Sequence, residues 1–309
     1  MIAAAVLAAL ATACALGAWR LAFARWPWRA PRSAILLWQS LGVTWGLASV
    51  GALLAYALAP YGGGVVYGLH TFLDSVISLG LGHGLLGPYD LPRVAALTAG
   101  LTLLAVLVVV LLAAGTQTLR ARRRHRALLC LIAHDDPGVP GVRILDHPGA
   151  AAYCLPGLRS EVVVSAGTLS LLSHDELTAV LAHEAAHVRE RHDLVLLPFT
   201  ALSWALPWLG VVRNAHSSVA LLVEMAADDR ARRYCSPRRL ATALLRFGTA
   251  GAVPAPDGAL GAGSSDHVMA RVNRLVKPGA ALPRRFRYSL VTFSVLLTIS
   301  APLLWLYPG

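Results

Sequence analysis

The residues that could carry chemistry are concentrated in one stretch, residues 173–192. Within it, His183 and His187 are four residues apart, in the order His-Glu-Ala-Ala-His, with Glu184 directly after the first histidine. Residues four apart share one face of a helix, so both imidazoles can bind the same metal ion while the carboxylate lies beside it. Two neutral histidines are typical ligands of Zn²⁺, and a nearby carboxylate can remove a proton from water. The motif predicts a zinc site, although the same five-residue pattern also occurs by chance.

A second acidic motif offers the third ligand that such a site requires. Glu224 and Asp228 stand one helical turn apart in the run 219–234, which contains no Gly or Pro. Glu224 would complete a His₂Glu set for one zinc ion per chain and leave the fourth position to water. Asp228 would hold the free N–H of a ligand histidine. In the alternative, both carboxylates lie on a solvated face and pair with nearby arginines, namely Arg230, Arg232 and Arg233.

The histidines are predicted to lie on a helix that begins at Ser173. Glu176, three places later, completes the pattern of a capping box, and an apolar series at helical spacing follows from Leu177. Three short runs before this helix are typical of strands, at residues 142–145, 153–156 and 161–165. The last two should pair around a turn at 157–159, so the region is predicted to be an α+β domain.

The two motifs together are similar to those of the gluzincin membrane peptidases. The HEAAH of 183–187 followed by the Glu-x-x-Ala-Asp of 224–228 resembles two families, the BlaR/MecR-type regulatory peptidases and the HtpX/CAAX-prenyl endopeptidases. The runs 153–157 and 161–167 are similar to the strand pair before the zinc helix in both families, and the resemblance covers about residues 120–309. HtpX-type proteins usually have Asn-Ala-Phe where this chain has Ala-Ala-Tyr at 151–153, which favours the BlaR/MecR type.

The resemblance implies a gluzincin-type metallopeptidase domain with a defined set of roles. Zn²⁺ would be held by His183, His187 and Glu224, Glu184 would act as the catalytic base, and Asp228 would support a ligand histidine. The substrate would dock as an added strand on the exposed edge of the sheet.

BlaR/MecR proteins carry an extracellular penicillin-binding sensor domain after their last membrane span. The chain stops at Gly309, where that span is expected to end, so we expect no sensor domain and no direct sensing of β-lactams. A short helix at 267–276 would precede the span. Its Arg271 or His267 could stabilise an oxyanion, or both could lie on the surface.

The composition is that of a membrane protein. Hydrophobic residues make up 56% of the 309 residues and charged residues 14%, and the mean hydropathy is +0.60. The net charge of +11 comes from arginines beside apolar segments, which fits the positive-inside rule and not direct nucleic-acid binding. The four cysteines show no C-x-x-C spacing, so neither disulfides nor cysteine metal ligands are expected.

We predict a mainly α, polytopic protein of the cell membrane with four spans. An N-terminal membrane region, 1–119, would hold three of them, at about 2–19, 34–59 and 94–114. A cytoplasmic zinc peptidase domain, 120–287, would follow, and the last span would be 288–309. The arginine clusters that border the spans place this domain in the cytoplasm and both termini outside.

Two further apolar segments need another placement. Residues 60–92 contain no Lys or Arg and are expected outside, as an interfacial or re-entrant segment. Their His70, Asp74 and His83 could be a ligand set or polar residues at a membrane surface. Residues 194–212 are long enough to span, but proposed ligands flank them. They must therefore form a hairpin, lie in the interface or cover the active site.

The sequence therefore predicts a zinc metalloendopeptidase that cleaves a cytoplasmic protein in regulatory proteolysis. By resemblance, the leading substrate is a winged-helix transcriptional repressor, and the Gly/Ala/Pro-rich loop 251–265 is a second candidate, for self-cleavage. One alternative is an HtpX-like protease for quality control of membrane proteins. Another is a non-catalytic membrane signal transducer, although every residue that catalysis needs is present.

Cysteine labelling from either side of the membrane tests the predicted topology. In a background without the four native cysteines, new cysteines in place of Arg191 and His216 should label from the same side. The reason is that the proposed ligands on either side of 194–212 must reach one ion. Labels on opposite sides would contradict both the membrane map and the metal assignment.

Overall fold

The chain forms two compact units in a computed structural model. The structure describes residues 1–62, 64–79, 91–135, 142–155, 161–250, 260–261, 265–277 and 279–307. One unit, which we call the helical unit, comprises Met1–Ala24, Leu36–Val110 and Pro283–Gly309. The other, the sheet unit, comprises Arg25–Ile35 and Leu111–Leu282. Two of the four boundaries between the units fall within helices, in α2 and α5, and the other two follow Ala24 and Leu282.

The helical unit contains the helices that were predicted to span a membrane. Its elements are α1 (Ile2–Ala22), most of α2 (Pro31–Ala57), η2 (Ala59–Tyr61), α3 (Gly64–Leu79), the first part of α5 (Leu91–Ile132) and α12 (Arg284–Leu306). By length and composition, α1, α2, α5 and α12 could each cross a membrane. Helix α5 has 42 residues, so it continues beyond the predicted end of the third span at 114. The path through a bilayer and the side of each end stay predictions.

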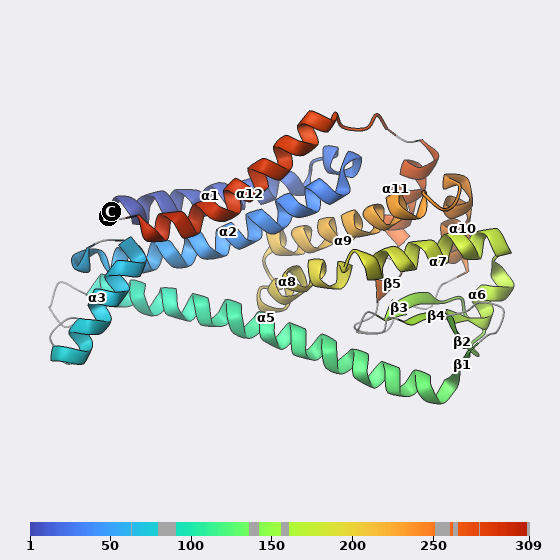
Figure 1. Cartoon of the computed structure of the whole chain (residues 1–309), viewed down its shortest axis with the longest axis horizontal. Helices are drawn as coiled ribbons and strands as arrows, with labels where there is room; N and C mark the ends of the chain where they lie inside the picture. Colours follow the sequence, from blue (N-terminus) through green and yellow to red (C-terminus); the bar gives the residue numbers. More distant parts are fainter. Residues whose placement is uncertain are drawn as a thin grey trace. The chain divides into compact units, whose positions relative to one another are not determined.

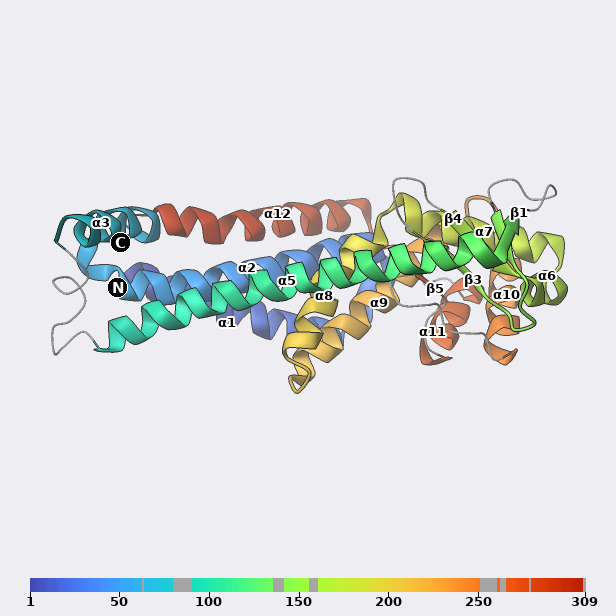
Figure 2. The same cartoon turned by 90° about the horizontal axis from the view of Figure 1, so that it is seen from below.

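Helix α12 lies along α2 (Figures 1 and 2). The indole N–H of Trp305 donates to the carbonyl of Leu47 at 3.2 Å, and the hydroxyl of Thr44 donates to the carbonyl of Leu297 at 2.9 Å. Gly51 leaves room for the indole, because a Cβ at Gly51 would lie 2.1 Å from its Nε1. A small residue and interhelical hydrogen bonds are typical of packing between membrane helices.

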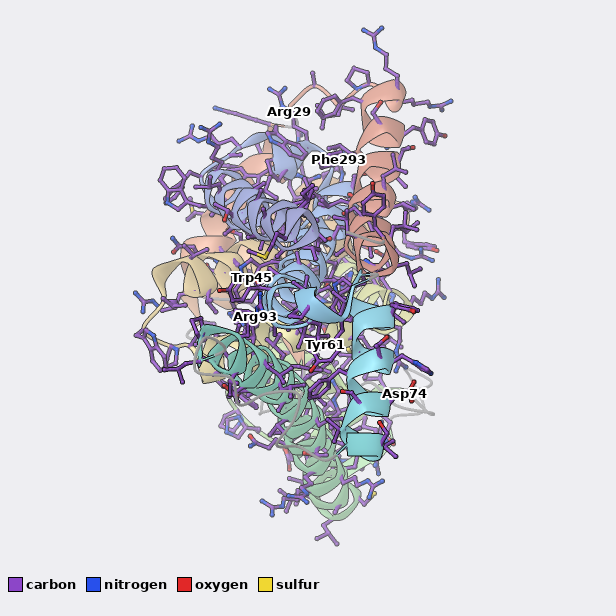
Figure 3. The ribbon with its side chains drawn as sticks, turned by 90° about the vertical axis from the view of Figure 1, so that its left-hand side faces the viewer. Arg29, Trp45, Tyr61, Asp74, Arg93 and Phe293 are labelled. Atoms are coloured by element: carbon purple, nitrogen blue, oxygen red, sulfur yellow. The ribbon has the colours of Figure 1, made fainter. Side chains whose placement is uncertain are left out.

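The segment 60–92 contains α3, which the structure describes to Leu79. His70 and Asp74 form an exposed pair one turn apart on this helix, with 3.1 Å between Nδ1 and Oδ2. Figure 3 shows Asp74 on α3. His83 lies outside the described residues. The placement of the first two residues favours the interpretation as polar surface residues.

The sheet unit holds a five-stranded sheet and a group of helices. In chain order its elements are η1 (Trp26–Arg29), the start of α2, the second part of α5, β1 (Ala133–Asp135), β2 (Val142–Leu145), β3 (Ala152–Leu155), β4 (Glu161–Ser165), α6 (Ala166–Leu171), α7 (His174–Arg189), α8 (His192–Ala205), α9 (Gly210–Ala231), α10 (Pro237–Thr249), β5 (Leu260–Gly261) and α11 (Ser265–Val276).

The order of strands in the sheet is β1-β2-β4-β3-β5. The expected pairing of β3 with β4 is confirmed as antiparallel, with Ala152 opposite Val164, while the turn at 157–159 lies outside the described residues. The far edge of β3 was expected to be exposed. It pairs instead with β5, where Cys154 lies opposite Leu260. Two residues of the expected loop 251–265 thus form a strand, and most of the others lie outside the described residues.

Both faces of the sheet are covered, because successive side chains of a strand point to opposite sides. Tyr153 and Leu155 pack with Leu129, from the last turns of α5, on one face. Val164 packs with Leu177 of α7 on the other. Strand β3 is buried along its whole length. The helix that carries the HEAAH motif is therefore fixed directly against the sheet.

The capping box at the start of α7 is confirmed. The backbone N–H of Ser173 donates to Oε2 of Glu176 at 2.9 Å, and the N–H of Glu176 donates to Oγ of Ser173 at 3.4 Å. The helix ends at Arg189, and Arg191 has a left-handed backbone with φ of 50°. This residue turns the chain into α8.

The segment 194–212 is a helical hairpin and not one continuous helix. Helix α8 ends at Ala205, the chain turns around Pro207, and α9 begins at Gly210. Helix α9 then returns beside α7 (Figure 1). The hairpin was one of the three expected arrangements, and it brings residues on both of its sides to the same place.

Two glycines offer a test of how tightly the sheet unit is packed. A Cβ at Gly167 would lie 2.1 Å from the carbonyl oxygen of Pro148, whereas a Cβ at Gly210 would meet nothing within 4 Å. We expect Gly167→Ala to destabilise the protein by about 1–3 kcal/mol, because backbone must move to admit the methyl group. Gly210→Ala should be neutral or slightly stabilising. Thermal unfolding in detergent measures both, and equal midpoints would contradict the packing at Gly167.

Candidate metal centre

Helices α7 and α9 bring three side chains with metal-binding atoms together. Nε2 of His183 lies 3.1 Å from Nε2 of His187 and 3.3 Å from Oε2 of Glu224, and Oε1 of Glu224 lies 3.5 Å from Nε2 of His187. All three residues are buried. The ligand atoms of a tetrahedral zinc ion lie about 3.3 Å apart, given zinc–ligand distances of about 2.0 Å. The donor set therefore fits Zn²⁺ and occupies three of four positions.

One arginine neutralises the two carboxylates of α9. Nη1 of Arg271 lies 2.7 Å from Oε2 of Glu224, while its Nε and Nη2 donate to the two oxygens of Asp228 at 2.9 and 2.7 Å. The side chain of Arg271 is 0% exposed. A surface position for Arg271 is therefore wrong. Helix α11 packs against α7, α9 and α10 through Val268, Val272 and Leu275, and this packing carries the guanidinium inward.

The alternative of a solvated, arginine-paired face for Glu224 and Asp228 is also wrong. Both carboxylates are buried between helices, and the nearby arginines have other partners. Arg230 lies 3.6 Å from Glu190, and Arg232 lies 3.6 Å from Asp229. The charges on α9 therefore divide between an inner pair, which faces the centre, and an outer group of ion pairs.

Asp228 lies where it can orient the first histidine. Its Oδ1 is 3.0 Å from Nδ1 of His183, so a proton on Nδ1 points at the carboxylate and leaves a lone pair on Nε2, which also lies 3.3 Å from Nη2 of Arg271. The proposed supporting role of Asp228 fits this geometry. Like the ligand roles of the two histidines and Glu224, it stays a prediction until metal binding is measured.

Burial and charge shift the pKa values at the centre in different directions. Burial and Arg271 both lower the pKa of His183, but Asp228 and Glu224 outweigh them and raise it to about 9. Burial lowers the pKa of His187 to about 3. Burial raises the pKa of Glu224, but Arg271 and the histidines outweigh it and lower the pKa to about 2. At pH 7, metal binding must therefore displace a proton from His183, so metal affinity should rise with pH up to about 9.

Glu184 lies beside the donor set with one free oxygen. The backbone N–H of Cys154 in β3 donates to its carboxylate, whereas its buried Oε2 has no hydrogen-bond partner among the described residues. Burial raises the pKa of Glu184 to about 8. A buried oxygen without a partner is unusual in a folded protein and fits a group that receives a proton from water.

His192 belongs to the site, and the sequence analysis did not assign it. It is 2% exposed, and its Nδ1 lies 3.0 Å from Nδ1 of His187. Burial lowers the pKa of His192, so the ring is neutral at pH 7. The one feature of the sequence that pointed to His192 is that it is a third histidine shortly after the HEAAH motif. Its place beside His187 in the fold depends on the left-handed turn at Arg191.

The other residues that the sequence singled out lie elsewhere. Nε2 of His267 lies 3.4 Å from the hydroxyl of Ser217, and the hydroxyl of Tyr153 lies 2.8 Å from Nε2 of His125. Neither pair contacts the three donor atoms.

Comparison with known proteins agrees with this geometry. Residues 96–237 match the sequence model of peptidase family M48, and this range includes the two histidines, Glu184 and Glu224. A protein named Protease HtpX homolog, from Aeropyrum pernix, is 37% identical over 75 residues. The aligned part covers 22% of this chain and 24% of that protein, so this chain spans about a quarter of the relative's length.

These similarities support a membrane metallopeptidase of the M48 type. Of the two families that the motifs resemble, the named relative belongs with the HtpX-type proteins. The preference for the BlaR/MecR type, which rested on Ala-Ala-Tyr at 151–153, is not confirmed.

Elemental analysis of detergent-purified protein tests the ligand set. We expect about one zinc ion per chain, as a mononuclear His₂Glu site requires. His187→Ala or Glu224→Ala should remove the zinc, whereas His267→Ala, a change outside the donor set, should not. Zinc that remains in the Glu224→Ala protein would show that another residue is the third ligand.

Proposed function

We propose that this protein is a zinc-dependent endopeptidase of the cell membrane, with His183, His187 and Glu224 as metal ligands and Glu184 as the general base. The observation that carries the proposal is the spacing of the three donor atoms, 3.1 to 3.5 Å, in a buried site. A structural zinc site is usually closed by four protein ligands, whereas a catalytic one has three and an open position. The similarity to peptidase family M48 supports peptide bonds as the target.

Zn²⁺, when bound, supplies a Lewis acid that polarises a carbonyl oxygen and acidifies water. Glu184 would take the proton of the attacking water on its free Oε2 and deliver it to the amine of the departing peptide. A pKa raised to about 8 makes this carboxylate a stronger base than an ordinary glutamate, and a bound cation would bring the value down towards neutrality. The Cys154 N–H holds the other side of the carboxylate in place.

Arg271 and Asp228 would set the charge of the centre without touching the reacting atoms. Arg271 keeps Glu224 ionised at neutral pH, and Asp228 fixes the ring of His183. Without Arg271, two carboxylates would be buried side by side with only His183 to offset their charge, which is unfavourable in a protein interior.

The edge of β3 is the proposed docking site for substrate. The backbone of Cys154 joins this strand directly to Glu184, so a peptide paired with β3 would pass the base. The pairing of β5 with Tyr153 and Cys154 supports strand addition, because it shows that this edge accepts an antiparallel partner. A substrate would have to displace β5 or extend from it. The same pairing keeps the segment 251–265 a candidate for self-cleavage.

Two biological roles are compatible with this chemistry. The similarity to a protein named Protease HtpX homolog favours quality control of membrane proteins. The residues at 151–153 favour regulatory cleavage of a cytoplasmic protein, with a winged-helix repressor as the leading candidate and no direct nucleic-acid binding by the peptidase. In both proposals the protein is multi-pass with a cytoplasmic catalytic domain, which the arginine clusters beside the apolar helices support.

Glu184→Gln tests the catalytic proposal. The amide keeps the size of the side chain but cannot accept the proton, so zinc should stay bound while peptide hydrolysis falls by about 10²–10⁴-fold. Asp175→Asn is the control, because Asp175 is an exposed carboxylate on the same helix, paired with Arg239. Full hydrolysis by the Glu184→Gln protein would show that another group is the base.

The same pair of proteins separates the two roles. Peptides that accumulate with wild type but not with Glu184→Gln identify the substrates in cells. If they come only from transmembrane or extracytoplasmic segments, the regulatory proposal fails and the quality-control proposal stands. A cut within 251–265 that needs Glu184 would show self-cleavage.

A further inference from the structure

The connection between α1 and α2, together with the first turn of α2, belongs to the same compact unit as the metal centre, and we call these residues, 25–35, the α1–α2 loop. This unit includes Arg25–Ile35 together with Leu111–Leu282. Arg32, in the first turn of α2, donates from Nε and Nη2 to the two oxygens of Glu190 at 2.9 and 2.6 Å. Nη2 also donates to the carbonyl of Ala226 in α9 at 3.0 Å. A bidentate pair of this kind fixes both the position and the orientation of the carboxylate.

Glu190 in turn lies next to His192, and His192 lies next to a proposed metal ligand. Oε2 of Glu190 is 3.5 Å from Nε2 of His192, and Nδ1 of His192 is 3.0 Å from Nδ1 of His187. This arrangement depends on the left-handed backbone of Arg191, which turns His192 back towards α7. A non-glycine residue in this conformation is strained, so the surrounding contacts must hold it there.

The position of each proton along the series His187, His192 and Glu190 follows from simple chemistry. A metal on Nε2 of His187 leaves the proton on its Nδ1, which must then donate to Nδ1 of His192. His192 therefore carries its own proton on Nε2, on the side of the Glu190 carboxylate. The carboxylate of Glu190 lies 3.5 Å from that nitrogen, as an electrostatic partner, and accepts two hydrogen bonds from Arg32. Each member thus selects the tautomer or orientation of the next.

We propose that Arg32 is a positioning residue of the metal centre, which holds the ring of His187 through Glu190 and His192. The proposal rests on the proposed function, because it takes Nε2 of His187 as a metal ligand. It extends that function to a loop between two helices that are long and apolar enough to cross a membrane. The support of the metal centre then includes Arg32, which lies far in the sequence from the motifs at 183–187 and 224–228.

A second contact anchors the same loop. Arg274 of α11 donates from Nε to the carbonyl of Trp28 at 2.7 Å and holds Asp229 with its two other nitrogens, each at 2.8 Å. The loop is therefore attached at two points. Arg32 binds Glu190 and the carbonyl of Ala226 in α9, and Arg274 of α11 binds the carbonyl of Trp28.

The rate at which zinc leaves the full-length protein in detergent tests the proposal. Excess EDTA is added to the zinc-loaded protein, and the zinc that remains is measured over time. Loss of a partner that supports a metal ligand typically weakens metal binding by about 10–100-fold. We expect zinc to leave Arg32→Gln and Glu190→Gln about tenfold faster than wild type, and His192→Ala at least as fast. The double variant Arg32→Gln/Glu190→Gln should lose zinc no faster than the single ones.

Three control variants separate positioning from general effects. Arg29→Gln removes the same charge from the same loop without touching Glu190. Arg246→Gln removes a comparable ion pair at the other end of α7, where Nη1 lies 2.7 Å from Oε2 of Glu176. Both should lose zinc at the wild-type rate. Arg32→Lys keeps the charge but not the bidentate geometry, so its rate should lie between those of wild type and Arg32→Gln.

Each outcome decides the proposal. It is overturned if Arg32→Gln loses zinc no faster than the two glutamine controls, or if the effects of Arg32→Gln and Glu190→Gln multiply. A wild-type protein that binds no zinc overturns both the proposal and the proposed function. A protein that binds zinc but hydrolyses no peptide overturns only the proposed function, because the release rates still measure how Arg32 supports His187.

Discussion

The structure depends on one constraint, the burial of several charged groups within a few ångströms of each other. Glu224 and Asp228 both face the centre, and each buried carboxylate would be strongly destabilising if left alone. Arg271 forms an ion pair with each of them, and its positive charge offsets the cost of burying two carboxylates beside two imidazoles. A centre assembled this way is preorganised, because its donor atoms are already at the separations that a tetrahedral ion requires.

This constraint explains the local architecture. Three helices have to meet with their polar faces inward, and each is held by apolar packing on its other side. Helix α7 packs on the sheet through Leu177 and Val180, and α11 packs on α10 through Val268 and Val272. The hairpin of α8 and α9 returns the chain so that the second motif runs beside the first. Packing therefore offsets the desolvation of the charges and keeps them in one geometry.

His183 and His187 have different surroundings, and each is supported by a different set of residues. His183 is oriented by Asp228, a neighbour of the third proposed ligand on α9. His187 is oriented by His192, which leads through Glu190 to the loop between α1 and α2. One support thus lies within the domain that matches peptidase family M48, and the other begins in a part of the chain that this match does not include. The second support begins between two helices that are long and apolar enough to cross a membrane.

The sequence by itself determined the features whose physical cause is local. The capping box of Ser173 and Glu176, the shared face of His183 and His187 and the apolar lengths of the long helices depend on spacing along one segment. For 194–212 the geometric requirement on the ligands excluded a single crossing but left three arrangements open, of which the hairpin was one. The strands at 142–145, 153–156 and 161–165 were predictable, because alternation and turn residues act over a few positions, whereas β1 and β5 were not predicted.

Only the tertiary structure decided which charged residues are partners. A surface position was open for Arg271 in the sequence, because arginine is usually exposed, and the sequence assigned neither His192 nor Arg32 to the site. Arg271 meets Asp228 across 43 residues and Arg32 meets Glu190 across 158. Such pairs form because packing of the apolar faces brings the helices together and excludes water. The free energy of that packing is spread over the whole unit, so no short stretch of the sequence reveals which charged residues will be partners.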